Sequence, residues 1–528
     1  IEKIFETRDQ RLLQKAQKVI CDNCRQLLRL SNGYLDWLRR VIRIDDLTDD
    51  LRLKLISEVE TYIEYDSEQS PEIVESVRDW LTVLSPTDFH GKLVTTVGIE
   101  PWDKELHGDK NLWKKEIQIL ALHLKTHPDD LKKELQWLCS PAAKSATLLG
   151  QELGLCDCEL KLVTIMFDAA KEYSGYLLIR GYIMGINCAC PDRLSEISVI
   201  MDSLESSFPE LAYQAAEVGG RGLNAVERTL RLIDSGKLPV TVLFTFFRGV
   251  GDSPLTREEF YSILTHFCSA IDSNIQGVSR VALQFVSWTL PDKNKVRDKN
   301  YLEDPETRNL VWHLLEAVIG KGEGESHDWH DVLEFLIPYD NSHVAFLASE
   351  ALISESSSYA DVAENILIQI AGTHPDIVME NFGNALLDKI SGWRLQVGKH
   401  TKVLLAIKND SIIGWLKKHG IVGSRAIARH LPEPAIKNGN PEVPEITAYI
   451  LEKYDGDEET FHGFTAGAHS FKMYSGDISA QHQAEADMAR KFLNHPLRRI
   501  REWAAIEIET ETNSAKRWRQ EKEERFLE

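Results

Sequence analysis

The stretch AEADMARKFLNHPLRRIREWAAIEIE, residues 484–509, decides the fold. Residues 484–493 predict one amphipathic helix, and residues 497–509 predict a second, because apolar side chains recur every three or four positions. His495-Pro496 lies between them. Proline suits a helix entry, since the first N–H groups of a helix have no partner inside it. The stretch therefore predicts two helices packed as a hairpin.

The same punctuation recurs at His127-Pro128, Phe208-Pro209 and His374-Pro375, each beside amphipathic helix patterns. Successive pairs cover about 40–47 residues, the size of a HEAT-type unit. Proline at the turn, arginine early in the second helix and small residues within it resemble a HEAT repeat. The predicted fold class is all-α: an irregular HEAT-like α-solenoid of stacked helix pairs.

Three segments interrupt the helix patterns. Residues 290–306 carry Pro291 and Pro305 around a charged run, and they predict a hinge between an N-terminal helical half, 1–289, and a C-terminal HEAT-like half, 307–528. Residues 320–330 are polar and rich in glycine, and residues 430–445 contain four prolines. Insertions in solenoids often lie on the binding face, so these loops are candidate functional segments.

The composition narrows the class of partner. Lysine and arginine number 61 against 82 acidic residues, a formal net charge of −21. Phosphate backbones need a basic footprint, so nucleic acid is disfavoured and a protein partner is favoured. No apolar run reaches the roughly 18–20 residues of a membrane span. No signal peptide is visible either, and we expect a cytoplasmic protein without a membrane partner.

The eight cysteines are too sparse for a disulfide scaffold. Most lie in apolar helical runs, where cysteine behaves as a small core residue, and we expect free thiols in a reducing compartment. Three close pairs, Cys21/Cys24, Cys156/Cys158 and Cys188/Cys190, leave a zinc site open as an alternative. Nothing in their spacing makes the pairs converge.

Other patterns for bound groups are weak. The glycine clusters at 219–222 and 320–324 do not follow a predicted strand, as a phosphate-binding loop requires. His327, His330 and Asp331 form a partial metal pattern without a clear further ligand. We therefore expect no cofactor and no metal.

One enzymatic alternative comes from a short motif. Arg308-Asn309 followed by His313 resembles the Arg-x(4–6)-His motif of HEPN-type ribonucleases, which would make Arg308 and His313 catalytic. A second Arg-x4-His occurs at Arg425 and His430. Chance produces about one such spacing in a chain of this composition, and a motif alone is only a hypothesis. We expect this segment to be non-catalytic.

Residues 420–477 are unusually rich in glycine, histidine and aromatic side chains. They favour an exposed recognition surface with arginine and aromatic anchors, although the same residues can simply fill a core or permit close helix packing. The residues that we predict to contact a partner are Arg425, His430, Phe464, His469, Tyr474, Asp477, Arg501 and Trp503.

The motifs Trp415-Leu416-x-x-His419-Gly420, 425–432 (RAIARHLP) and 500–504 (IREWA) resemble the α-solenoid sensor regions of large bacterial antiphage STAND-type, AVAST-like NTPases. The resemblance covers mainly the last 120 residues. It implies a sensor that binds a phage protein and triggers oligomerisation. The nucleotide-binding core of that family would precede such a region, and Ile1 in place of methionine fits a chain with upstream sequence.

These observations together predict a non-catalytic protein-recognition scaffold or sensor arm in antiviral defence. Its partner would be a phage protein or a neighbouring defence subunit, and a homo-oligomer is compatible with this function. A transport or assembly adaptor of the HEAT type stays open beside the HEPN-like ribonuclease.

Overall fold

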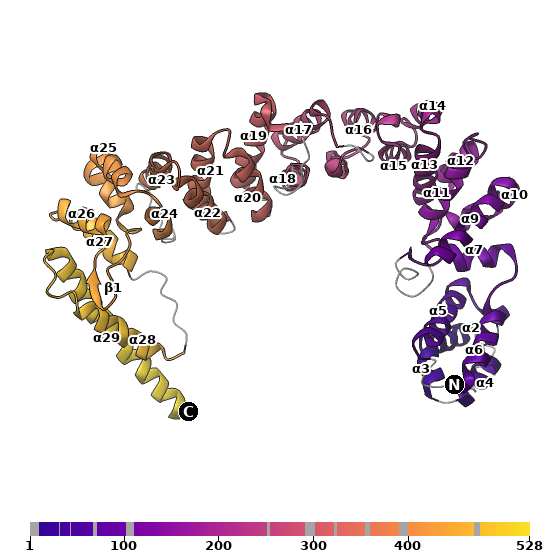
Figure 1. The fold of residues 1–528 in the computed structure, drawn as a ribbon, viewed down its shortest axis with the longest axis horizontal. Coiled ribbons are helices and arrows are strands. Elements are labelled where there is room, and N and C mark those ends of the chain that lie inside the picture. Colours follow the sequence, from indigo (N-terminus) through magenta and orange to yellow (C-terminus); the bar gives the residue numbers. More distant parts are fainter. Residues whose placement is uncertain are drawn as a thin grey trace. The chain divides into compact units, whose positions relative to one another are not determined.

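The computed structural model describes residues 10–527 apart from 31, 43, 67–70, 102–109, 251–253, 291–300, 322–324, 354–358, 390–399 and 469–475. The described residues are mostly helical, as predicted (Figure 1). The chain divides into two compact units, Ile1–Glu259 and Phe260–Glu528. The predicted hinge at 290–306 falls inside the second unit, and residues 291–300 lie outside the described ones, so that hinge stays a prediction.

The helices of the first unit have the following bounds: α2 Gln10–Asp22, α3 Cys24–Leu30, α4 Asn32–Val41, η1 Ile44–Asp46, α5 Asp49–Tyr65, α6 Pro71–Leu84, α7 Phe89–Val97, α9 Lys110–Thr126, α10 Pro128–Leu138, α11 Ala146–Cys156, α12 Val163–Tyr173, α13 Tyr176–Ala189, η3 Pro191–Arg193, α14 Leu194–Leu204, α15 Pro209–Gly219, η4 Gly220–Leu223, α16 Ala225–Asp234 and η5 Val240–Arg248. Helix α17, Arg257–Asp272, begins at the end of this unit.

The elements of the second unit continue as α18 Val278–Thr289, η6 Tyr301–Glu303, α19 Pro305–Lys321, α20 Ser326–Leu336, α21 Asn341–Ile353, α22 Ala360–Ala371, α23 Pro375–Lys389, α24 Thr401–Ala406, α25 Asn409–Ala428, β1 Ala435–Lys437, β2 Asn440–Glu442, α26 Glu445–Lys453, α27 Glu458–Ala468, α28 Ile478–Arg490 and α29 Arg498–Leu527. The two strands pair antiparallel through the turn Asn438-Gly439, where both residues have positive φ. This hairpin is the turned backbone predicted for the proline-rich segment.

The helices pack in two rows within each unit. In the first unit α9, α11, α13 and α15 contact one another in succession, and α10 contacts α12 beside them. In the second unit α21, α23, α25 and α27 form one row, and α18, α20, α22 and α24 form the other (Figure 1). Buried leucine, isoleucine, valine and phenylalanine side chains fill the space between rows. The arrangement confirms the predicted irregular HEAT-like α-solenoid.

Local sequence explains where helices begin. Pro128, Pro209 and Pro375 each open a helix, as the punctuation predicted. The side chains of Thr48 and Asp88 accept hydrogen bonds from the backbone N–H groups of Leu51 and Gly91, which caps α5 and α7. Most of the apolar run at 238–247 lies in the 3₁₀ segment η5, Val240–Arg248.

Glycine allows two helices of the first unit to pack with their backbones in contact. Helix α11 carries Gly150 and Gly154, and α13 carries Gly181 and Gly185. A Cβ on Gly181 would lie 2.0 Å from the carbonyl oxygen of Thr147, and one on Gly154 would lie 2.1 Å from that of Tyr182. The two backbones therefore touch where they cross, which only residues without a Cβ permit.

Candidate binding surfaces

Arg425 lies in an ion-pair network between neighbouring helices of the second unit. Its Nε and Nη2 donate to the carboxylate of Asp457 at 3.0 and 2.5 Å, and Nη1 lies 2.6 Å from Oε2 of Glu459. Asp457 also accepts from the backbone N–H of Thr460 at the start of α27. The hydrogen bonds from Arg425 hold the pKa of Asp457 far below its usual range. Arg425 thus joins α25 to α27.

His430 is buried against a second histidine. Its Nδ1 accepts a hydrogen bond of 3.1 Å from the backbone N–H of His400, and the two rings stack with centroids 5.5 Å apart. Phe382 packs edge-on against both rings. Burial lowers the pKa of His400 to about 4. The pair fixes the segment before α24 to the end of α25.

Phe464 and Trp503 are core residues of the second unit. They are 1% and 0% exposed, and their ring centroids lie 6.3 Å apart between α27 and α29. Neither side chain reaches the surface of the folded chain. His469 and Tyr474 lie outside the described residues. Aromatic enrichment draws attention to these residues, but composition alone does not distinguish a core residue from a surface residue that anchors a partner.

Among the predicted contact residues that the structure describes, Asp477 and Arg501 are exposed. Asp477 accepts from the backbone N–H of Ala480 and so caps α28, and its carboxylate lies 3.4 Å from Nζ of Lys522. Arg501 donates to the carbonyl oxygens of His495 and Pro496 at 2.7 and 2.8 Å, which closes the turn between α28 and α29. Both residues retain accessible polar surface.

A cavity of about 330 Å³ lies beside Asp477, between the first turn of α28 and the far part of α29. Its walls are formed by Gly476, Asp477, Ile478, Ser479, Trp518, Glu521 and Lys522. Ser479 fixes the wall, because its hydroxyl donates to the carbonyl oxygen of Ala515 and accepts from Nε of Arg519. The cavity combines an apolar floor with an ion pair at its rim.

Trp518 is not among the predicted contact residues, because it lies in a strongly charged run. A signal was nonetheless present. Ala504, Glu507, Glu511, Ala515 and Trp518 follow one another at spacings of three or four, and the first four are buried. The inward face of α29 therefore continues to Trp518.

Below the cavity, α28 and α29 bury an ionisable pair. Nδ1 of His482 lies 2.5 Å from Oε2 of Glu511, with both side chains almost fully buried. The two buried groups stabilise each other through this hydrogen bond, because burying either one without a partner would cost free energy. The pair fixes the register of the two helices that carry the cavity walls.

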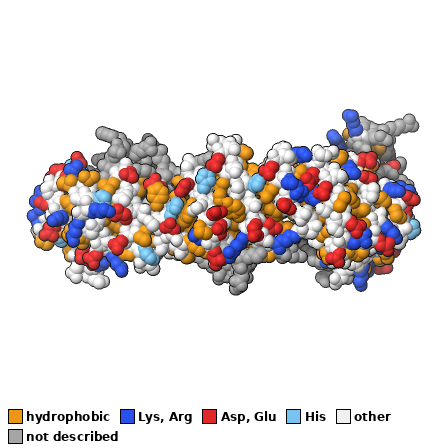
Figure 2. All heavy atoms as spheres, turned by 90° about the horizontal axis from the view of Figure 1, so that it is seen from above, with side chains coloured by type: hydrophobic (Ala, Val, Ile, Leu, Met, Phe, Trp, Pro, Cys, Tyr) orange, Lys and Arg blue, Asp and Glu red, His pale blue; other side chains and the backbone are white. Residues whose placement is uncertain are grey.

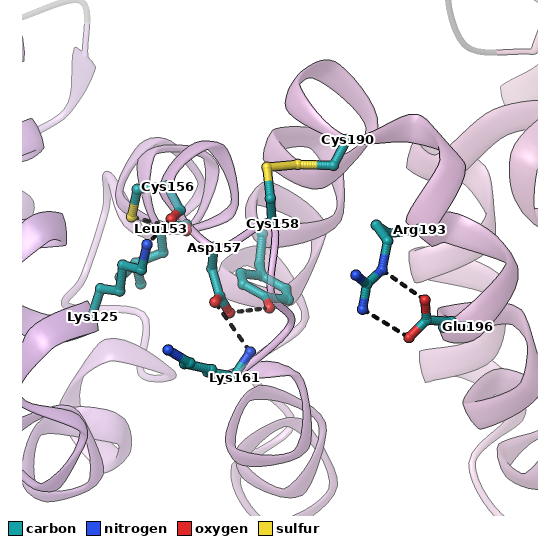
Figure 3. The surroundings of a disulfide bond; sticks show 10 residues. Lys125, Leu153, Cys156, Asp157, Cys158, Lys161, Cys190, Arg193 and Glu196 are labelled. Atoms are coloured by element: carbon teal, nitrogen blue, oxygen red, sulfur yellow. Dashed lines mark hydrogen bonds and ion pairs between the residues drawn. A yellow bond between two sulfur atoms is a disulfide. The ribbon is translucent and has the colours of Figure 1, made fainter.

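Cys158 and Cys190 form a disulfide, with Cα atoms 5.7 Å apart (Figure 3). The expectation that all cysteines are free thiols is therefore wrong for these two. The close crossing of α11 and α13 aligns the helix ends, so the loop after Cys156 meets the end of α13. Cys156 and Cys188 stay free, and the described residues show no zinc-type cluster of cysteines.

Asp157 holds together the loop that follows α11, next to the disulfide. It is fully buried, and its carboxylate accepts from the backbone N–H of Lys161 (Figure 3). The same carboxylate accepts from the backbone N–H of Leu162 and from the hydroxyl of Tyr182 at 2.7 Å. Burial of the Tyr182 hydroxyl and its bond to Asp157 raise the pKa of Tyr182. Every contact of Asp157 described above is internal to the chain, which indicates a structural role.

The ribonuclease motif does not form a shared site. Nη1 of Arg308 donates to the carbonyl oxygens of Leu302 and Glu303, and its guanidinium lies 5.0 Å from the ring centroid of Tyr339. Nε2 of His313 lies 2.8 Å from Oδ1 of Asp272 on α17. The two side chains are engaged with different neighbours, so the geometry does not favour a joint catalytic role.

The predicted partial metal pattern of His327, His330 and Asp331 is only partly brought together. His330, Asp331 and Glu334 on α20 place one ligand atom each within 4.8 Å of one another, whereas His327 pairs with Asp328. All three lie on one helix, and Asp331 is exposed. A tight site draws further ligands from other elements, and we assign no metal here.

The surface view in Figure 2 shows hydrophobic side chains interspersed with acidic and basic ones. Within the described residues, no helix combines the length and the apolar character that crossing a bilayer requires.

No family model and no curated protein matches the chain. A solved structure described as a circular tandem repeat protein with novel repeat topology and enhanced subunit contact surfaces is similar over 97% of this chain and 99% of that chain. The identity is 13% and the TM-score is 0.18, and at these values the similarity supports no conclusion about function.

Proposed function

We propose that the chain is a non-catalytic scaffold that binds another protein, and that the α28–α29 cavity receives an apolar side chain of that partner. The cavity carries the proposal. Its volume suits one large side chain, and Trp518 and Ile478 supply the apolar contact. Energetically dominant interface contacts are typically anchors inserted into such pockets, surrounded by polar residues that exclude water.

The rim of the cavity supports the same function. Asp477 and Lys522 offer one charge of each sign next to the apolar floor. Such a rim orients a partner through hydrogen bonds without favouring a highly charged polymer. A formal net charge of −21 works against a nucleic-acid partner as well.

We further propose that the chain is the sensor arm of an antiviral defence protein, with a phage protein as the partner. The support is the resemblance of 415–432 and 500–504 to antiphage sensor regions. A transport or assembly adaptor would bind a host protein instead.

The experiment that tests the scaffold uses capture with the purified chain from phage-infected and uninfected cells, followed by affinity measurement with the purified partner. We expect Trp518→Ala to weaken binding by about tenfold or more, because an anchored interface loses at least ~1.4 kcal/mol when its pocket is opened. Trp288→Ala is the matched control, since Trp288 is 48% exposed on α18 and away from the cavity.

The outcomes separate the alternatives. A partner found only in infected cells supports the sensor, and a host partner supports the adaptor. Equal affinities for the wild type and the Trp518→Ala chain, with the fold of the variant verified by circular dichroism, would reject the cavity as the binding site.

A further inference from the structure

Another cavity lies in the first unit and is lined by arginine. It has a volume of about 830 Å³ and forms where the end of α4, the segment η1, the first turn of α5, the end of α6 and the cap of α7 converge. Its walls are formed by Arg39, Arg40, Ile42, Ile44, Asp46, Arg52, Thr82, Val83, Ser85, Thr87 and Asp88. Three guanidinium groups therefore share one recess of a strongly acidic chain.

The arginines are held in place by backbone carbonyls. Nε of Arg52 donates to the carbonyl oxygen of Leu84 at 2.8 Å, Nε of Arg40 donates to that of Asp36 at 3.3 Å, and Nη2 of Arg39 donates to that of Ser76. A carbonyl orients a guanidinium without neutralising its charge. These contacts leave the Nη groups of Arg40 and Arg52 for another acceptor.

Within the described side chains, direct carboxylate contacts reach only part of this cluster. Among the described side chains, Asp36 approaches Arg39 at 4.0 Å, and no carboxylate lies within that distance of Arg40 or Arg52. Of the two acidic residues in the wall, Asp88 caps α7 by accepting from the N–H of Gly91 at 2.8 Å, and it keeps its negative charge near Arg52. That hydrogen bond holds the pKa of Asp88 below its ordinary value. The wall has more positive than negative side chains.

We infer that this cavity binds a small phosphate-class anion, either free phosphate or pyrophosphate, or the phosphoryl group of a metabolite. Guanidinium groups recognise tetrahedral oxyanions through paired N–H donors, and several of them around a recess give both charge and geometry. The hydroxyl of Thr87 adds a neutral donor at the wall. The chain's net charge of −21 repels an acidic macromolecule at long range, whereas a small ion can reach the guanidinium groups of the wall on its own.

This site is separate from the α28–α29 cavity, so its test is independent of the proposed protein binding. Isothermal titration of the full chain with phosphate, pyrophosphate and ATP, at low ionic strength and at constant pH, gives the affinities. We expect saturable binding of at least one of these anions. Arg40→Gln should weaken it by about tenfold, the effect of losing one charge-assisted contact.

Two further variants sharpen the test. Arg40→Lys keeps the charge but loses the planar donor pair, and we expect it to restore only part of the affinity. Asp46→Asn removes an opposing charge from the wall and should strengthen binding. Arg517→Gln on α29 is the control, because this arginine is 68% exposed and far along the chain from the cavity.

The identity of the tightest ligand distinguishes free phosphate from a phosphorylated metabolite. The inference is wrong if none of the three anions binds to a chain with a native circular dichroism spectrum. It is equally wrong if Arg39→Gln/Arg40→Gln binds as tightly as the wild type. Binding that chloride abolishes at equal ionic strength would show a general charge effect and would overturn it too.

Discussion

At the scale of single residues, burial decides the role of the polar side chains. Arg425 and His430 were predicted to contact a partner, and the structure places them in an inter-helix ion pair and a buried histidine stack. Arg499 shows the same behaviour, since it is 3% exposed, pairs with Glu458 and Glu502, and lies over the ring of Phe461. Arg425, His430 and Arg499 therefore join neighbouring elements of the second unit.

His400 makes the second unit sensitive to acid. Its pKa in the folded chain is about 4, below the ordinary 6.5, because burial disfavours the charged ring. The unfolded chain therefore binds a proton first as the pH falls, and stability is lost between pH 6.5 and about 4. Between about pH 7.5 and pH 5 we expect His400 to contribute a loss of about 2 kcal/mol in the free energy of unfolding.

Urea unfolding at the two pH values measures this loss. His400→Phe keeps a stacking ring without the titrating group, so its stability should fall by about 2 kcal/mol less than that of the wild type. His127→Gln, at an exposed histidine, should follow the wild type. Identical pH profiles for the His400→Phe variant and the wild type would contradict the assignment.

At the scale of helices, the close crossing of α11 and α13 depends on glycine. We expect Gly181→Ala to lower the free energy of unfolding by about 3 kcal/mol, because the added methyl group meets backbone atoms that cannot move independently. Gly414→Ala on α25 is the matched comparison, since no heavy atom outside the backbone of its own helix lies within 4 Å of the position that its Cβ would take. That change should stabilise by about 0.5–1 kcal/mol through helix propensity. Thermal unfolding of the two variants should therefore shift in opposite directions.

The Cys158–Cys190 bond joins the same two helices across a sequence separation of 32 residues. Closing a loop of that length restricts the unfolded chain, and reduction should cost about 3–4 kcal/mol of stability in the first unit. Thiol titration in denaturant should find six reactive cysteines before reduction and eight after it. Cys190→Ser should reproduce the loss and Cys188→Ser should not. If a chain that was never exposed to reductant showed eight reactive thiols, the bond would not form.

At the scale of the whole molecule, the sequence predicts the fold class well and the sites poorly. Helix periodicity and proline punctuation are local properties, so Pro128 and Pro375 correctly marked helix starts. The disulfide and both cavities depend on which helix faces meet, and the spacing of Cys158 and Cys190 along the chain does not contain that information. Aromatic enrichment predicted that Phe464 and Trp503 contact a partner. Their burial depends on how the helices pack, which local sequence does not show.

The glycine crossing also has a mechanical consequence. Helices that touch through long side chains can slide past one another when those side chains change rotamer, which is how shear between packed helices proceeds. Backbone pressed against backbone at Gly154 and Gly181 offers no such freedom, and a covalent bond holds the ends of the same pair. The α11–α13 pair should therefore move as one rigid body within its unit. When a partner deforms the unit, the movement should occur at the helix contacts on either side of this pair.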